Sequence, residues 1–234
     1  MEVRTLFITG TDTDVGKTMV CGCLVQYLFQ VGVDVGVQKW ASTGNRDSSD
    51  DVEFCLRLLG ADRSKLDAMS DLAPYTFSIA ASPHLAAEVE GRRIEAAVIR
   101  ESYHRISQKH EFIVVEGVGG VMVPLTRDLL LIDLLQELAI PTLVVARTKL
   151  GTINHTLLTI EALRRRDIDI LGVVFNSLGG EDDVIANDNV DIIAHIGQLE
   201  VLGVLPEAPL DQCVQAFIPI GERILSRMGG LSAA

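Results

Sequence analysis

The chain has 234 residues, of which 48% are hydrophobic, so we expect one large domain with a sizeable core. Its formal net charge of −12 at pH 7 argues against a nucleic-acid partner, because an acidic surface repels phosphates. No apolar run approaches the ~20 residues that span a bilayer, and the N-terminus lacks the basic start and apolar core of a signal peptide. We therefore expect a cytoplasmic protein with no membrane partner.

The cysteines of the chain are Cys21, Cys23, Cys55 and Cys213. They show neither a CxxC spacing nor a cluster with histidine, which argues against a zinc site. Cys21 and Cys23 lie two positions apart on an expected helix and so point to different faces. Free thiols in a reducing cytoplasm are the expected state.

Apolar runs rich in β-branched residues and leucine alternate with helix-like stretches along the chain. Continuous apolar runs are typical of parallel strands covered on both faces, and the alternation predicts a doubly wound, mainly parallel α/β sheet. We expect a single domain over residues 1–228 and a flexible tail over residues 229–234. Ligands of such sheets bind at the carboxyl ends of the strands. The expected strands are residues 5–9, 33–38, 112–116, 142–146, 171–175 and 201–205, and the expected helices are residues 17–30, 50–59, 94–108, 129–138, 153–166, 183–195 and 213–227.

The stretch Gly10-Thr-Asp-Thr-Asp-Val-Gly-Lys17-Thr18 follows the first expected strand and opens the first expected helix. This is the context of a phosphate-binding loop, in which backbone N–H groups converge on phosphate. Lys17 can reach the outer phosphates, and the Thr18 hydroxyl can bind Mg²⁺. Five residues separate Gly10 from Gly16, one more than in the general pattern. The residues expected to contact ATP here are Thr13, Asp14, Val15, Gly16, Lys17, Thr18 and Met19.

Polar residues follow the second expected strand. The sequence Lys39-Trp-Ala-Ser-Thr-Gly44 can bind an anion through its lysine and hydroxyls, although a surface lysine is a common alternative. Asp50 opens the next expected helix, where an acid favours the helix dipole and Ser48 or Ser49 can cap the helix end. A dipole role and magnesium binding therefore stay open as alternatives for Asp50.

The third expected strand ends in an acid, Glu116, which is followed by Gly117-Val-Gly-Gly120. Four apolar residues and then an acid are typical of the strand that faces the metal beside a phosphate-binding loop. A glutamate at the end of a core strand is costly unless it is paired. We therefore predict that Glu116 binds the metal or its water. The glycines Gly117, Gly119 and Gly120 would permit backbone contact with a phosphate or substrate.

The fourth expected strand leads into Arg147-Thr-Lys-Leu-Gly151-Thr-Ile-Asn154, which opens a helix. The backbone N–H groups at this helix start can hold an anion. His155, which comes next, is predicted to be a capping or surface residue rather than a catalyst. The sequence shows no Ser/His/Asp or Cys/His set for nucleophilic catalysis.

The fifth and sixth expected strands lead to Asn176-Ser177 and to Pro206-Glu207. An asparagine amide offers both a donor and an acceptor, so Asn176 can recognise adenine. Pro206 and Glu207 can pack on the base. These residues are therefore candidates for the adenine end of a nucleotide site.

Four motifs in the same order make the chain resemble the dethiobiotin synthetases over about residues 5–206. The family's substrate lysine lies in a Lys-Pro-Val-x-Ser/Thr-Gly stretch, which reads Lys39-Trp-Ala-Ser-Thr-Gly44 here, without the proline. The acidic ligand that follows fits Asp50 best, with Asp51 as the alternative. The four motifs are the loop Gly10–Thr18 with its longer spacing, Pro74-Tyr-Thr-Phe77 with Ser82-Pro-His84, Glu116-Gly-Val-Gly-Gly120, and Lys149-Leu-Gly-Thr-Ile-Asn-His155.

The resemblance implies a P-loop NTPase fold and an ATP-dependent ring closure in biotin biosynthesis. CO₂ from bicarbonate would form a carbamate on 7,8-diaminononanoate, ATP would phosphorylate the carbamate, and the second amine would close the ureido ring. Lys17 and Lys39 would neutralise charge on the γ-phosphate and the carbamate, and Thr18, Asp50 and Glu116 would hold Mg²⁺.

The resemblance also implies a homodimer in which the substrate spans the interface. The substrate contacts it implies are Lys39, Ser42, Thr43, Gly120, Gly151, Thr152, Ile153 and Asn154. Further ATP contacts are expected at Asp50, Glu116, Gly117, Gly119, Asn176, Ser177, Pro206 and Glu207.

Two other classes of protein share the expected sheet. Switch ATPases of the partitioning and cell-division type carry a lysine five positions before the loop lysine, where this chain has Asp12. Amidoligase-type synthetases of cobalamin assembly usually carry an additional glutaminase domain, for which this chain is too short. An ATP-turnover assay with diaminononanoate and bicarbonate separates these alternatives from the synthetase.

Overall fold

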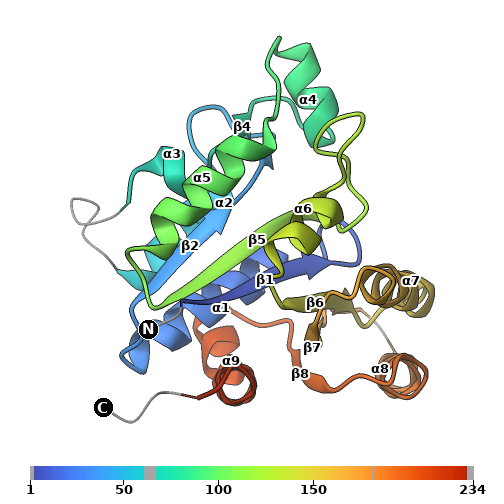
Figure 1. Cartoon of the computed structure of the whole chain (residues 1–234). Helices are drawn as coiled ribbons and strands as arrows, with labels where there is room; N and C mark the ends of the chain where they lie inside the picture. The colour runs from blue at the N-terminus through green and yellow to red at the C-terminus, as the bar shows by residue number, and fades with distance from the viewer. Residues whose placement is uncertain (1–2, 61–66, 181, 231–234) are drawn as a thin grey trace.

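The computed structural model describes residues 3–60, 67–180 and 182–230 (Figure 1). Over these residues, six strands form one sheet in the spatial order β2–β5–β1–β6–β7–β8, and each neighbouring pair runs parallel. The prediction of a parallel α/β sheet is therefore confirmed. The strands are β1 Arg4–Gly10, β2 Val35–Lys39, β5 Phe112–Gly120, β6 Thr142–Arg147, β7 Ile170–Asn176 and β8 Val201–Leu205.

Helices cover both faces of this sheet. α1 packs against α2 and α9 on one face, whereas α5 and α7 pack against strands of the other face (Figure 1). After β1 the chain moves to one side of the sheet to form β2, and after β5 it moves to the other side to form β6. Such a reversal places the ligand crevice at the carboxyl ends of the central strands. The helices are α1 Lys17–Gln30, α2 Asp50–Leu59, α3 Met69–Leu72, α4 Pro83–Val89, α5 Ala96–Ser107, α6 Leu131–Leu138, α7 Thr152–Arg164, α8 Asp183–Gly197 and α9 Leu210–Arg227.

Four short elements do not follow from the sequence patterns. They are α3, α4 and the strands β3 Ser42–Thr43 and β4 Thr76–Phe77, which pair in parallel as a small second sheet. Elements of this length are too short to show a hydrophobic period. In addition, β5 runs past its expected end at Glu116, because Gly120 pairs with Gly10 of β1.

The central strands are buried on both faces, as their continuous apolar sequences predict. β5 is buried from Phe112 to Gly117, and the core continues onto α1, where Leu24 and Leu28 are fully buried. Burial of each such large apolar side chain stabilises the fold by roughly 1.5–3 kcal/mol. The four cysteines are free and buried, and burial raises the pKa of the Cys23 thiol to about 12.

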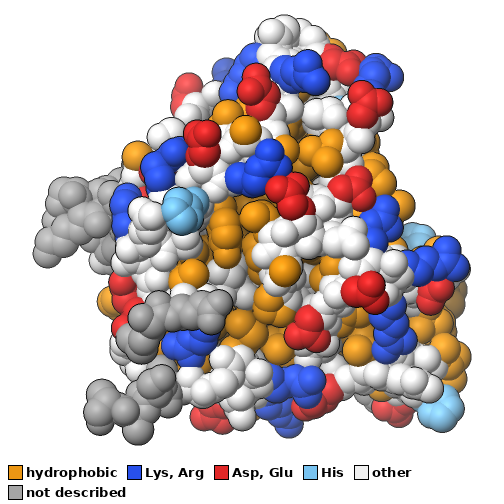
Figure 2. Space-filling view, in the orientation of Figure 1, with side chains coloured by type: hydrophobic (Ala, Val, Ile, Leu, Met, Phe, Trp, Pro, Cys, Tyr) orange, Lys and Arg blue, Asp and Glu red, His pale blue; other side chains and the backbone are white. Residues whose placement is uncertain are grey.

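The surface carries charges of both signs. On the face in Figure 2, Lys and Arg side chains lie among Asp and Glu side chains rather than in one basic patch. Within the described ranges, no helix is long and apolar enough to cross a membrane. The expected tail at residues 229–234 begins with Gly229 and Gly230, whose amides still bond to carbonyls of α9, and residues 231–234 lie outside the described residues. The single-domain boundary stays a prediction.

Candidate functional site

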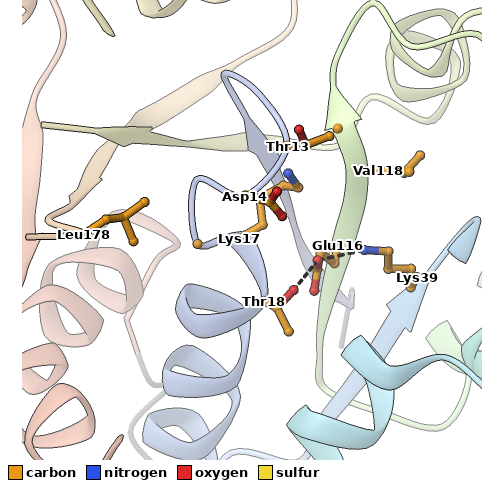
Figure 3. Close-up of a pocket in the computed structure, with 10 residues that line it drawn as sticks. Thr13, Asp14, Lys17, Thr18, Lys39, Glu116, Val118 and Leu178 are labelled. Carbon is orange, nitrogen blue, oxygen red and sulfur yellow. Dashed lines mark hydrogen bonds and ion pairs between the residues drawn. The ribbon is translucent and has the colours of Figure 1, made fainter. Parts of the chain in front are cut away.

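The carboxyl ends of β1, β2 and β5 surround a cavity of about 300 Å³ (Figure 3). Lys39 ends β2, Glu116 lies on β5, and the predicted phosphate-binding loop follows β1. The structure therefore brings together residues that lie far apart in the sequence. The cavity is lined by Thr13, Asp14, Gly16, Lys17, Thr18, Lys39, Glu116, Val118, Gly119 and Leu178. The sequence patterns do not predict Val118 or Leu178 as site residues.

The loop ends at Gly16 in a left-handed conformation with φ of 93°, directly before α1. A Cβ atom at Gly16 would lie 1.9 Å from Asn176 Nδ2, so only glycine fits this position. The Asn176 amide donates a hydrogen bond of 3.2 Å to the Val15 carbonyl oxygen. Asn176 at the end of β7 therefore holds the loop backbone at Val15. The same side chain leaves no room for a Cβ atom at Gly16.

Lys17 turns back over its own loop. Its Nζ donates a hydrogen bond of 2.9 Å to the carbonyl oxygen of Asp12. The Asp12 carboxylate accepts a hydrogen bond of 2.8 Å from the Thr13 amide and lies 3.3 Å from Arg147 Nη2. Burial lowers the pKa of Lys17, and the nearby Lys39 ammonium lowers this pKa further. An anion in the cavity would relieve both effects by supplying opposite charge.

Two acids, one hydroxyl and one ammonium meet beside the start of α1. Thr18 Oγ1 lies 2.7 Å from Asp51 Oδ1 and 2.9 Å from Glu116 Oε1. Lys39 Nζ lies 2.6 Å from Asp51 Oδ2 and 2.8 Å from Glu116 Oε1. Figure 3 shows Thr18 and Lys39 converging on Glu116. Because Glu116 is only 2% exposed, these contacts offset the cost of burying its carboxyl group.

The pKa values of Lys39 and Asp51 reflect the ion pair between them. Burial disfavours the charged form of Lys39, but the carboxylates of Glu116 and Asp51 outweigh burial and raise the lysine's pKa. Burial also disfavours charged Asp51, but Lys39 outweighs it and lowers the pKa of that carboxyl. The cluster is therefore an ion-paired one.

Asp51, and not Asp50, supplies the second acid of this cluster. The sequence favours Asp50, whose side chain is exposed and accepts a hydrogen bond of 2.9 Å from Asn45 Nδ2. Ser49 caps α2 by accepting a hydrogen bond from the Val52 amide. Neighbouring residues of a helix point about 100° apart, so the two acids cannot both face the phosphate-binding loop. The structure therefore brings Asp51 rather than Asp50 to Thr18 and Lys39, and the identity of the acid that binds metal stays a prediction.

The oxygens of Thr18, Asp51 and Glu116 are the ligand type that Mg²⁺ prefers. The described part of the chain holds no group of three or more His, Cys, Asp and Glu side chains that could bind a metal alone. Magnesium here would need further oxygens from phosphates or water, which is its usual condition in ATP sites. The Lys39 ammonium lies between the two acids and stands in for such a cation, so the donor set fits a divalent metal.

Known proteins resemble this chain over most of its length. A family profile described as an AAA domain matches residues 4–212. The chain is 38% identical over 213 residues to "ATP-dependent dethiobiotin synthetase BioD" of Halalkalibacterium halodurans, covering 88% of this chain and 86% of the relative. It is 41% identical over 208 residues to the protein of the same name from Anaeromyxobacter dehalogenans, covering 88% and 92%. The chain belongs to the dethiobiotin synthetase family.

Solved structures share the fold of this family member at lower identity. The MinD cell division protein of Aquifex aeolicus matches with a TM-score of 0.61 over 99% of both chains, at 16% identity. A ParA family ATPase of Chlorobium tepidum matches with a TM-score of 0.56 over 97% of this chain and 92% of that one, at 14% identity. At these identities the likeness is one of fold alone. The family assignment therefore rests on the synthetases that match in sequence.

Trp40 stands where the pattern of the dethiobiotin synthetases has proline, directly after Lys39. Its side chain is fully buried, with its ring centroid 5.0 Å from that of Phe7. Its Nε1 donates a hydrogen bond of 3.1 Å to Gln38 Oε1, and Gln38 Nε2 donates one of 2.8 Å to the Asp71 carbonyl oxygen. Packing and buried hydrogen bonds therefore hold the backbone beside Lys39, where the family pattern uses a proline ring.

Two of the substrate residues that the family implies, Ser42 and Thr43, form β3. Ser42 is buried, its amide bonds to the Tyr75 carbonyl and its hydroxyl donates to Asn45 Oδ1. Neither Ser42 nor Thr43 is among the residues that line the cavity beside Lys39. Their substrate contacts stay predictions.

A second cavity, of about 260 Å³, lies between the start of the loop, the end of β5 and α7. Gly120, a substrate residue that the family implies, lines it. Gly151, with φ of 93°, precedes α7, while Thr152 is buried and Asn154 is exposed. Residues 151–154 line neither this cavity nor the first one in the described chain.

The predicted adenine residues lie at the neighbouring ends of β7 and β8. The Ser177 amide donates a hydrogen bond of 2.9 Å to the Leu205 carbonyl oxygen, which joins the two strand ends. Leu178, which follows Ser177, lines the cavity that also holds Lys17 and Lys39. The base contacts expected of Asn176, Ser177, Pro206 and Glu207 stay predictions.

Proposed function

We propose that this chain is an ATP-dependent dethiobiotin synthetase, which carboxylates 7,8-diaminononanoate and closes its ureido ring in biotin biosynthesis. We place it in the cytoplasm, where its free cysteines stay reduced. The observation that carries the proposal is one charged cluster, in a chain of this family, beside a phosphate-binding loop. The cluster consists of Lys17, Thr18, Lys39, Asp51 and Glu116.

The reaction has three steps. One amine of the substrate attacks CO₂, loses a proton and becomes a carbamate. A carbamate oxygen then attacks the γ-phosphorus of ATP, which forms a carbamic-phosphoric anhydride and releases ADP. The second amine attacks the carbonyl carbon, expels phosphate and closes the ring. This chemistry needs positioning and charge stabilisation more than it needs a protein nucleophile.

Lys17 and the loop backbone would bind the triphosphate. Lys17 Nζ donates a hydrogen bond to the Asp12 carbonyl oxygen, and a phosphate oxygen would replace that acceptor. The helix start after Gly16 directs backbone N–H groups and the positive end of the α1 dipole at the same place. These interactions grow stronger as charge develops on the transferred phosphoryl group.

Thr18, Asp51 and Glu116 would hold Mg²⁺, which neutralises negative charge on the transferred phosphoryl group when it is bound. Lys39 ends the strand next to Glu116 and lines the same cavity as Lys17. Its ammonium would stabilise the carbamate and the oxygens that gain charge during transfer. Lys17 would therefore serve ATP, and Lys39 the acceptor.

We further propose a homodimer in which residues 151–154 of one chain bind the carboxylate of substrate held by the partner. A helix start stabilises an anion by about 0.3–1 kcal/mol when exposed and by up to ~2 kcal/mol when partly buried. These residues line neither cavity of their own chain, and the neighbouring Leu150 is 83% exposed. Met122 and Leu158, which line the second cavity, are also exposed and suit a two-fold contact.

The deciding assay measures ADP formation and ring product with diaminononanoate, bicarbonate and ATP. We expect ATP turnover to require both the diamine and bicarbonate, because phosphorylation has no acceptor without the carbamate. A switch ATPase would instead hydrolyse ATP at a rate that the diamine does not change. That second result would overturn the proposed activity.

Complementation tests the shared substrate site. A Lys17→Ala chain is mixed with a chain that carries Gly151→Trp, each inactive by itself. If sites are shared across the interface, mixed dimers contain one site with both normal halves, and activity partly returns. Mixing that restores no activity, in samples shown to exchange subunits, would mean that each chain is self-sufficient.

A further inference from the structure

The acid cluster at the phosphate-binding loop has more acceptors than donors unless an ammonium joins it. Thr18 Oγ1 lies within hydrogen-bond distance of both Asp51 and Glu116, but a hydroxyl carries only one proton. Lys39 supplies the remaining donors, with its Nζ 2.6 Å from Asp51 and 2.8 Å from Glu116. The ammonium therefore satisfies the oxygens that a bound metal would otherwise satisfy.

The charges of the cluster also balance without a metal. Asp51 and Glu116 oppose Lys39 and Lys17, so these four groups are formally neutral, and Asp14 on the cavity wall adds one negative charge. A divalent cation that arrived alone would leave an excess of positive charge in a partly buried site, which is costly. A cation that arrives with a triphosphate brings its own compensation.

We propose that Lys39 is the counter-cation of the metal-binding acids in the nucleotide-free protein, and that Mg²⁺ arriving with ATP displaces its ammonium into the cavity. The lysine then faces the carbamate only after nucleotide and metal have bound. This device rests on the metal site of the proposed function and does not depend on the identity of the amine substrate. It gives Lys39 two successive partners, the acids first and the substrate afterwards.

The chain carries its own reporter for this displacement. Trp40 is the single tryptophan, and it directly follows Lys39. Its ring is fully buried against Phe7. Movement of the lysine changes the field and the packing at the indole, so Trp40 emission should change when the ammonium leaves the acids.

The experiment titrates Mn²⁺, as a probe for the magnesium site, into the full-length protein without nucleotide and follows binding by calorimetry. Lys39→Met removes the charge and keeps the length of the side chain. Lys109→Met is the matched control, since it removes an ammonium from an ion pair with Asp67 at the surface. Lys39→Arg keeps the charge. The titrations are repeated with a non-hydrolysable ATP analogue while Trp40 emission is recorded in chains that keep the wild-type Lys39.

Without nucleotide, we expect Lys39→Met to bind Mn²⁺ about tenfold tighter than wild type or more, because a like charge has left the site. Lys109→Met and Lys39→Arg should bind Mn²⁺ as weakly as wild type. With the analogue, wild type should bind Mn²⁺ tightly and its Trp40 emission should change, whereas Mn²⁺ alone should leave the emission unaltered.

Three results overturn the inference. If Lys39→Met binds Mn²⁺ no tighter than wild type, while analogue-dependent binding is intact, Lys39 does not occupy the metal site and the proposed function stands. If Lys39→Met does not fold, wild-type protein that binds Mn²⁺ equally well with and without the analogue also shows that Lys39 does not block the metal site. If wild type binds no Mn²⁺ even with the analogue, the proposed metal site fails together with the inference.

Discussion

Two charged clusters lie at opposite ends of the same strands and differ in how their charges are matched. At the carboxyl ends of β2 and β5, Lys39 is shared between Asp51 and Glu116 beside a cavity. At the amino ends, His110 lies 2.9 Å from Asp34 and 2.7 Å from Asp67.

The amino-end cluster holds elements together. Lys109 adds a second contact to Asp67, and the side chains of Lys109 and Asp34 are 50% and 57% exposed. In the carboxyl-end cluster, by contrast, both Glu116 and its partner Lys39 are buried. Both clusters therefore share their charges, but the carboxyl-end cluster buries its ammonium beside a cavity, whereas the amino-end cluster is partly open to solvent through Asp34 and Lys109.

The largest expected effect is on kcat/KM, which should fall on substitution at the carboxyl-end cavity but not at the amino-end cluster. Lys17→Ala should lower kcat/KM by about 100- to 1000-fold, or roughly 3–4 kcal/mol of transition-state stabilisation, because the γ-phosphate loses its ammonium. Lys109→Ala, at the other end, should leave kcat/KM near wild type. Steady-state assays of both variants measure this difference. Near-normal turnover by Lys17→Ala would remove Lys17 from the nucleotide site.

A smaller effect distinguishes the two neighbouring acids of α2. Asp51→Asn should raise the Mg²⁺ concentration needed for half-maximal activity by about 10- to 100-fold, because the metal loses a charged ligand. Asp50→Asn changes an exposed side chain that accepts a hydrogen bond from Asn45, so it should stay close to wild type. The measurement is kcat/KM as a function of Mg²⁺ concentration. The reverse ranking of the two variants would restore Asp50 as the ligand.

Stability should depend on the residue that replaces the family's proline. Trp40→Phe leaves the buried Gln38 Oε1 without its indole donor, which should lower the free energy of unfolding by about 1–3 kcal/mol. The matched control is Phe29→Leu, an exposed site expected to change stability by less than about 0.5 kcal/mol. Urea unfolding followed by circular dichroism compares them. Equal stability of the two variants would mean that the indole does not anchor this segment.

The smallest expected effect is the pH dependence of stability that His110 contributes in the amino-end cluster. Burial lowers the pKa of His110, but hydrogen bonds to Asp67 and Asp34 outweigh burial and raise it above the usual 6.5. The stability that charged His110 contributes is therefore fully present below pH 6.5 and is lost as pH rises through the raised pKa. Because the cluster is partly exposed, the loss should not exceed about 1 kcal/mol.

Urea unfolding of wild type and His110→Gln at about pH 6 and about pH 9 measures this contribution, because titration of all other groups cancels between the two chains. The wild type should lose more stability than the variant on going to high pH. If the free energy of unfolding depends on pH identically in both chains, His110 is not charged in the folded protein.

Much of the fold and part of the site could be predicted because their signals are local. The centre of β1, Leu6-Phe7-Ile8, is apolar and fully buried, and the Gly-Lys-Thr after the strand opens α1 at Lys17, as expected. The acid at the end of an apolar strand likewise identifies Glu116. Such signals are carried by a few neighbouring residues, so no tertiary information is needed to find them.

Distances between segments far apart in the chain could not be predicted in this way. Asp50 and Asp51 are equivalent in sequence, and the rotation of α2 about its axis determines that Asp51 meets Thr18. The sequence predicts that Asn176 reads adenine, and only the fold shows that its amide also donates a hydrogen bond to the Val15 carbonyl of the loop.

Hydrophobic period and contiguous motifs are enough to specify the parallel sheet, the phosphate-binding loop and the resemblance to the dethiobiotin synthetases. The partners of Lys39, by contrast, depend on the fold. β2 pairs with β5 so that Lys39 lies opposite Glu116, and α2 brings Asp51 to the same ammonium. The physical reason is that a charge acts over a few ångströms, and those distances are set by packing rather than by position along the chain.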